Sequence, residues 1–326
     1  MPVVKVEQGG AAIPLPPDVR LKTVSVQVPD SSATAQANFY YTSSLSLSRR
    51  AALVIFGNQP AITGSLQIEE SARAKIEAVL SAHLADAGFG TYAYVLPDCS
   101  GKSAQTCSAP KRTDIDEQGP LALAADVDQL CEQARRQWLR SGSEALVLIT
   151  FGQASAAVLG SACAEQAKAI FMISPVFVQQ DKAWVDALEM AWRDKSSIAT
   201  YDRSKVRNQA ASVEATFSSM RNKLFSPDAR VLGATVDYWM KWSDLGPNSA
   251  KEAAKLASPQ IYVVPGKDYM MHKANLAAVR AVSASRKGGP KSVVDLQEVN
   301  GWLSNGSGPD IDAVMSLVEL VKKYAE

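Results

Sequence analysis

The sequence predicts an α/β protein with a doubly wound, mainly parallel sheet and an inserted helical cap. Short, continuous apolar runs such as Arg50–Gly57 and Ala169–Val176 alternate with longer segments of helical periodicity. This alternation is typical of buried parallel strands that are joined by helices. After the sixth expected strand, residues 180–258 have helical patterning only. Because an ordinary connection is much shorter, we expect this segment to be an insertion.

The other elements follow in order along the chain. Val19–Val28 and Ala35–Thr42 alternate apolar and polar side chains, which predicts a pair of antiparallel edge strands. Further strands are expected at 91–97, 146–150, 260–265 and 292–299, and helices at 68–87, 121–140, 273–285 and 310–324. The predicted organisation is an N-terminal extension over 1–18, a core formed by 19–179 and 259–326, and a helical cap over 180–258.

Composition excludes several classes of function. The chain has 326 residues, of which 47% are hydrophobic, and a formal net charge of +1. Its basic residues are scattered and form no stripe with interleaved aromatic residues, so we expect no nucleic-acid partner. No apolar run is long enough to span a membrane. We find no phosphate-binding loop and no cluster with metal-ligand spacing, so we expect no cofactor and no metal.

The four cysteines bear on the compartment. Cys99 and Cys107 share one loop, and Cys131 and Cys163 fall in two predicted helices that could be neighbours. Two disulfides would indicate a periplasmic or secreted protein, and four reduced thiols a cytoplasmic one. The first residues lack the charged-then-apolar pattern of a signal peptide, although a chain that begins after a removed signal would look the same.

One stretch, Ala145–Ala164, has the pattern of a strand, a tight turn and a helix of small residues. A nucleophile elbow occurs in this context, and its strained turn requires small residues two positions before and after the central one. Gly152 and Ala156 satisfy that requirement around Ala154. The sequence therefore predicts that a methyl group occupies the position at which an elbow presents a hydroxyl.

The order of elements from Val19 to Tyr324 resembles that of the α/β-hydrolase superfamily, including a cap after the sixth strand. In that family a nucleophile, usually serine, occupies the elbow, an acid follows the seventh strand and a histidine follows the eighth. The resemblance places Ala154 at the nucleophile position, Asp268 of Pro-Gly-Lys-Asp at the acid position and Asn300 at the histidine position. It also implies an oxyanion site formed by Asn58, Gln59 and Ser155.

These substitutions leave two interpretations open. A serine needs a base to become a nucleophile, an alanine cannot attack, and an asparagine amide accepts no proton near neutral pH. The first interpretation is an esterase or thioesterase that acts on an acyl ester and is inactive as written, because Ala154 and Asn300 are inactivating substitutions. The second is a natural pseudoenzyme that binds an apolar small molecule, or a partner protein, through the pocket and the cap.

Six further residues are candidates for ligand binding: Phe56, Gln153, His272, Trp302, Trp239 and Trp242. His272 is either a solvated residue at a helix start or a displaced base. Trp239 and Trp242, with other cap tryptophans, form either the cap's own core or an apolar lid over an acyl or aryl ligand.

Overall fold

The computed structural model describes residues 15–27, 34–43, 50–56, 66–95, 119–138, 145–193, 203–231, 234–285, 292–305 and 308–326. The expected oxyanion residues Asn58 and Gln59, and the cysteines Cys99 and Cys107, lie outside these ranges. Within the described residues, no helix combines the length and apolar character needed to cross a membrane. The same part of the chain contains no group of three or more acidic, histidine or cysteine side chains that could hold a metal ion.

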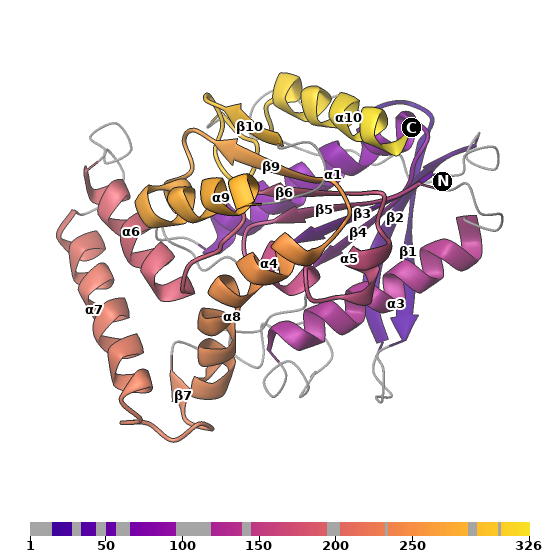
Figure 1. Ribbon diagram of the computed structural model, residues 1–326. Helices are drawn as coiled ribbons and strands as arrows, with labels where there is room; N and C mark the ends of the chain where they lie inside the picture. The colour runs from indigo at the N-terminus through magenta and orange to yellow at the C-terminus, as the bar shows by residue number, and fades with distance from the viewer. Residues whose placement is uncertain are drawn as a thin grey trace.

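An eight-stranded sheet forms the centre of the molecule, in the order β1-β2-β4-β3-β5-β6-β9-β10 (Figure 1). β1 (Val19–Gln27) pairs antiparallel with β2 (Thr34–Thr42), which pairs antiparallel with β4 (Gly90–Val95). All other pairings are parallel, and they involve β3 (Arg50–Phe56), β5 (Ala145–Phe151), β6 (Ala169–Ile173), β9 (Gln260–Pro265) and β10 (Ser292–Leu296). The predicted mainly parallel, doubly wound sheet is therefore confirmed.

The central strands are continuous apolar runs because helices cover both of their faces. Every residue of β5, β6 and β9 is buried, as is every residue of β3 after Arg50. Since these strands are parallel, their C-terminal ends lie along one edge of the sheet, here called the carboxyl edge. In open α/β sheets, ligands bind outside this edge.

Two hydrophobic clusters, one on each face, hold the helices to the sheet. One cluster joins the strands to α1 (Leu66–Asp86) and α10 (Ile311–Ala325). The other joins them to helices on the opposite face, namely α3 (Pro120–Trp138), α4 (Ala154–Val158), α5 (Ala162–Gln166), α8 (Val236–Lys255) and α9 (Lys273–Ser285). Figure 1 shows the resulting three layers, with the sheet between the two sets of helices.

The residues between β6 and β9, here called the helical segment (180–258), contain α6 (Gln180–Arg193), α7 (Arg203–Arg221) and α8. The sequence did not predict the short hairpin of β7 (Arg230–Val231) and β8 (Ala234–Thr235) within it. The segment shares the core of the sheet, because aromatic residues of all three helices belong to the same cluster as α3 and α4. α8 also contacts α4 directly, since the Ser249 hydroxyl donates to the Ala156 carbonyl oxygen at 2.9 Å.

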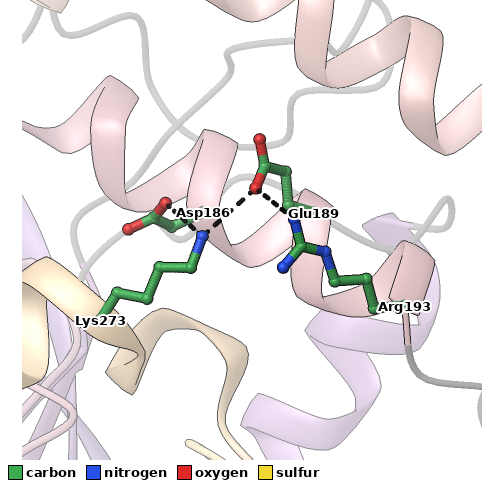
Figure 2. Close-up of polar contacts among 4 residues, drawn as sticks. All are labelled: Asp186, Glu189, Arg193 and Lys273. Carbon is green, nitrogen blue, oxygen red and sulfur yellow. Dashed lines mark hydrogen bonds and ion pairs between the residues drawn. The ribbon is translucent and has the colours of Figure 1, made fainter.

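Ion pairs link the helical segment to α9 on the surface. Lys273, the first residue of α9, lies between two carboxylates of α6, with its Nζ 3.8 Å from Asp186 and 3.4 Å from Glu189 (Figure 2). Arg193 approaches the same Glu189 carboxylate at 3.6 Å. The four side chains are 25–56% exposed, so each pair contributes little to stability. They join the surface of α6 to the start of α9.

A disulfide joins α3 to α5. Cys131 and Cys163 are bonded, with Cα atoms 6.0 Å apart, and both residues are buried. Asp128, one turn earlier on α3, accepts hydrogen bonds from the N–H groups of Cys163 and Ala162, at 2.8 and 3.3 Å. The disulfide and the carboxylate therefore hold the first turn of α5 from the same side.

We predict that the double variant Cys131→Ala/Cys163→Ala unfolds at lower urea concentration. The bond spans 32 residues, and removing a cross-link of this span costs about 3–4 kcal/mol, chiefly by freeing the unfolded chain. Equilibrium urea unfolding measures the difference. Because both sulfur atoms are buried, reductant without denaturant should leave the wild type bonded, and ready reduction of the native protein would contradict this placement.

Candidate active site at the carboxyl edge

The turn between β5 and α4 is built around Gly152. β5 ends at Phe151, Gly152 has a left-handed backbone with φ of 59°, and Gln153 is already helical. Glycine adopts this conformation without steric cost. The sequence placed the centre of the elbow at Ala154, but Ala154 is the first residue of α4 and is fully buried. The strained position of the turn therefore lies two residues earlier than expected and carries no side chain.

Ser155 is committed to local hydrogen bonds. Its hydroxyl lies 2.8 Å from the Thr150 hydroxyl at the end of β5, and its N–H donates to the Gly152 carbonyl oxygen at 3.2 Å. The sequence expected this N–H to serve as an oxyanion donor. In the structure it closes the tight turn instead, so it does not point at a reacting group.

Ser174, which follows the neighbouring strand β6, was not among the site residues expected from the sequence. It follows β6 directly, is fully buried and has a left-handed φ of 51°. Serine pays a steric cost in this conformation, and strain of this kind is often found at functional sites. Only the position of Ser174 between a buried strand and Pro175 could have drawn attention to it, because neither residue forms a recognised motif.

Ser174 faces Asp268, which follows β9. The Asp268 Oδ1 accepts a hydrogen bond from the Met270 N–H at 2.9 Å and so begins the short 3₁₀ helix η3 (Tyr269–Met271). Its Oδ2 and the Ser174 hydroxyl are both buried, and neither has a hydrogen bond of good geometry. Burial raises the pKa of the Asp268 carboxyl, although the nearby Ser174 hydroxyl and the Met270 N–H partly oppose this shift.

The loop after β10 closes against the same carboxylate. A Cβ atom at Gly301 would lie 2.5 Å from the Asp268 Oδ2 and 3.3 Å from the Ser174 Oγ, so only glycine fits there. Asn300, which the sequence placed at the histidine position, uses its side-chain oxygen to accept from the N–H groups of Trp302 and Ser304, at 2.9 and 3.1 Å. Asn300 therefore holds the turn of this loop.

Asn275, at the start of α9, ties the loops after β6 and β9 together. Its Oδ1 accepts from the Phe177 N–H at 2.9 Å, and its Nδ2 donates to the carbonyl oxygens of Pro175 and Met270, at 3.0 and 2.9 Å. The residue is almost fully buried. Because Pro175 follows Ser174 and Met270 is bonded to Asp268, Asn275 sets the spacing of the serine and the carboxylate.

Neither histidine of the chain completes a catalytic set. His272 ends η3, four residues after Asp268, and its imidazole makes no hydrogen bond or ion pair within the described residues. His83 lies in the last turn of α1, which leads into the start of β4 and hence to the opposite edge of the sheet. Burial lowers the pKa of His83.

The aromatic candidates are parts of the core. Phe56 and Phe151 stack with centroids 4.6 Å apart at the ends of β3 and β5, and Trp302 lies against both rings. Trp239 and Trp242 of α8 are also buried, and Trp239 packs edge-on against Trp184 at 5.3 Å. Gln153 is buried as well and accepts a hydrogen bond from the Gln180 amide at the start of α6.

We predict that Asn275→Ala is strongly destabilising, by about 3 kcal/mol, because one buried N–H and two carbonyl oxygens lose their partner together. Thermal or urea unfolding measures the loss. Asn305→Ala provides the matched control, since the Asn305 side chain bonds to Asp310 at the exposed surface and its removal should change the free energy of unfolding by under about 0.5 kcal/mol. Equal effects in the two variants would contradict the proposed clamp.

We predict that Asp268→Asn stabilises the protein near neutral pH. The folded pKa of this carboxyl is raised, so the native state binds the proton more tightly and loses stability as the pH rises above the unfolded pKa of about 3.9. The amide keeps the Oδ1 acceptor and removes this penalty.

The stability difference between Asp268→Asn and wild type should therefore shrink as the pH falls toward about 3.9 and vanish below it. Asp228→Asn is the control, because a hydrogen bond from Ser226 lowers the pKa of this exposed carboxyl and its pH trend has the opposite sign. Unfolding curves at several pH values measure both, and parallel trends would refute the assignment for Asp268.

Comparison with known proteins identifies the architecture. No protein-family model matches the chain, and no curated protein matches its sequence. The esterase domain of a Rhodothermus marinus protein matches with a TM-score of 0.51 and 14% identity, over 94% of this chain and 98% of that one. A Rhizomucor miehei esterase structure gives 0.55 and 10%, over 96% and 86%. A thioesterase domain from the curacin biosynthetic pathway gives 0.50 and 10%, over 93% and 99%.

These neighbours cover nearly the whole of both chains, and their low identity limits the likeness to the fold. This likeness in fold agrees with the strand order, the antiparallel second strand and the turn from β5 into α4. The chain has the α/β-hydrolase fold.

Proposed function

We propose that this protein binds a small acyl-type ligand at the carboxyl edge and beneath the helical segment, without covalent catalysis. The observation that carries the proposal is Gly152. The left-handed residue of the turn after β5 is the one that an elbow uses to present its nucleophile, and here it is a glycine. No atom at this position can attack a carbonyl carbon.

The base is missing for an independent reason. Gly301 approaches the Asp268 carboxylate so closely that no side chain fits between them. The Asn300 oxygen is already bonded to two N–H groups of its own loop. Hydrolysis through a serine requires a base that takes the hydroxyl proton, and among the described residues no imidazole is hydrogen-bonded to Asp268.

This geometry favours the natural pseudoenzyme over an inactivated esterase. Restoring Ala154→Ser would place a hydroxyl inside α4, at a fully buried position. Restoring Asn300→His would remove the acceptor that holds the loop after β10. Neither change returns a nucleophile and base to one another, so the double variant should gain no esterase activity.

Ligand binding is supported by groups that the fold leaves unused. Ser174 keeps a strained backbone, and its buried hydroxyl faces the Oδ2 of Asp268 without a hydrogen bond of good geometry. Unpaired buried polar groups are costly and uncommon in folded proteins. The neighbouring structures are named as esterases and a thioesterase, which favours an acyl ligand at this edge.

The experiment has two arms. A fluorophosphonate probe and an activated acyl ester should give no labelling and no burst with wild type or with Ala154→Ser/Asn300→His. A thermal-shift panel of short- and medium-chain acids and esters should contain members that raise the melting temperature, since saturation at 100 times Kd adds about 2.7 kcal/mol. Labelling of any serine, Ser174 included, would refute the non-catalytic assignment, and a panel without any shift would refute ligand binding.

A partner protein is a second candidate, favoured by exposed apolar side chains on the helical segment. Leu224 and Phe225, which follow α7, are 72% and 39% exposed, and Trp192 at the end of α6 is 36% exposed. Leu224 and Phe225 are adjacent in the chain, and exposed apolar patches often mark an interface. Loss of a captured partner in Leu224→Ser/Phe225→Ser, and its retention in Leu121→Ser on α3, would support this role.

We also propose an oxidising compartment. The Cys131–Cys163 bond is buried between α3 and α5 and has no catalytic neighbour among the described residues, which is typical of a structural disulfide. Protein isolated from its native source with alkylation before unfolding should retain this bond. Two alkylated thiols at these positions would indicate a reducing compartment.

A further inference from the structure

A network of polar side chains runs from the turn after β5 into the helical segment. Gln153 accepts a hydrogen bond from the Gln180 amide. The next residue, Asp181, accepts from the Arg221 guanidinium at the end of α7 and from the Ser243 hydroxyl of α8, the latter at 2.8 Å. The glutamines, Asp181 and Ser243 are all at least 95% buried. The network therefore connects the carboxyl edge with all three helices of the segment.

Several N–H groups beside this network are buried without a partner. The Trp184 and Trp242 indole nitrogens have no hydrogen bond, although the two residues are only 4% and 2% exposed. The Nε of Arg221 is also inaccessible and unpaired, as is the Oε1 of Gln180. Folded proteins satisfy nearly all such groups, so three donors and one acceptor in one region indicate a place for a hydrogen-bonding ligand.

These groups share one location. Trp184 packs edge-on against Phe217 of α7 at 5.9 Å, and the Arg221 guanidinium carbon lies 6.0 Å from the same Phe217 ring. Trp239 packs against both Trp184 and Phe217, and Trp242 lies one turn after Trp239 on α8. The unpaired donors therefore lie on the three helices that meet around Phe217, here called the three-helix junction.

We propose that the three-helix junction binds the carbonyl or carboxylate oxygens of the ligand's acyl group through the N–H groups of Trp184, Trp242 and Arg221. The inference rests on the proposed function and names the part of the ligand that is recognised. The excess of donors over acceptors favours a group that only accepts hydrogen bonds, and a carboxylate accepts the strongest ones. A ligand that only donates would leave all three N–H groups unpaired.

The tryptophans allow a matched test. Trp184→Phe and Trp242→Phe remove the indole N–H and keep an aromatic ring in the core. Trp239→Phe is the control, because the Trp239 Nε1 already donates to the Val231 carbonyl oxygen at 2.7 Å. Titration calorimetry with octanoate, methyl octanoate and octanol measures affinity, and thermal unfolding of the free proteins measures stability.

We expect Trp184→Phe and Trp242→Phe each to weaken octanoate binding about tenfold, the worth of one hydrogen bond to a charged acceptor. Their melting temperatures should not fall below that of Trp239→Phe, because no hydrogen bond is lost in the free protein. Trp239→Phe should melt earlier and bind octanoate as wild type does. Tighter binding of octanoate than of methyl octanoate would identify a free acid as the ligand. Tighter binding of methyl octanoate would identify an ester.

Three results would overturn the inference. Unchanged octanoate affinity in Trp184→Phe/Trp242→Phe would show that the acyl group does not bind at the junction, and the proposed function would remain intact. Octanol binding as tightly as octanoate would show that the acyl oxygens are not recognised. If none of the three probes binds wild type and the broader acid and ester panel gives no shift, the proposed function fails and the junction assignment fails with it.

Discussion

Three backbone hydrogen bonds hold the carboxyl edge together, and the site depends on them. The first residue after each of three successive strands still donates its N–H to the neighbouring strand. These bonds join Gly152 to Ile173 at 2.8 Å, Ser174 to Val263 at 3.0 Å and Gly266 to Leu296 at 2.8 Å. Because each turn remains fixed to the sheet, the chain must leave the edge sharply. Two of the three residues, Gly152 and Ser174, do so with a left-handed backbone.

This constraint supports the proposed absence of covalent catalysis. A sharp turn after β5 requires a left-handed residue, and glycine fills it without strain while contributing no reacting group. Ser174 differs from Gly152, because its backbone is strained and it carries a hydroxyl. Asn275 then fixes the loop after Ser174 to the loop of Asp268 through three hydrogen bonds. The edge is thus polar, and in the proposed function it binds a ligand without attacking it.

The fold could be predicted from the sequence because it depends on periodicity, whereas the site depends on backbone angles. Continuous apolar runs gave β3, β5, β6 and β9 within a few residues. Small-residue spacing centred the predicted elbow on Ala154, because spacing alone does not give the sign of φ. Glycine's tolerance of the left-handed region is the signal that could have pointed to Gly152 instead. No pattern in the sequence distinguishes the aromatic core around Trp239 from a ligand lid, because burial has the same periodicity in both.

The two carboxylate oxygens of Asp268 have different roles. Oδ1 begins η3 by accepting the Met270 N–H, a structural task that asparagine or serine could also perform. Oδ2 has no hydrogen bond of good geometry, and burial raises the pKa of the group, so folding alone gains little from a carboxylate over an amide. In the non-catalytic binding protein proposed above, this cost is best explained by use of the charge or proton in binding. The same reasoning applies to the unpaired donors of the three-helix junction, which are costly in the free protein and useful only when an acceptor reaches them.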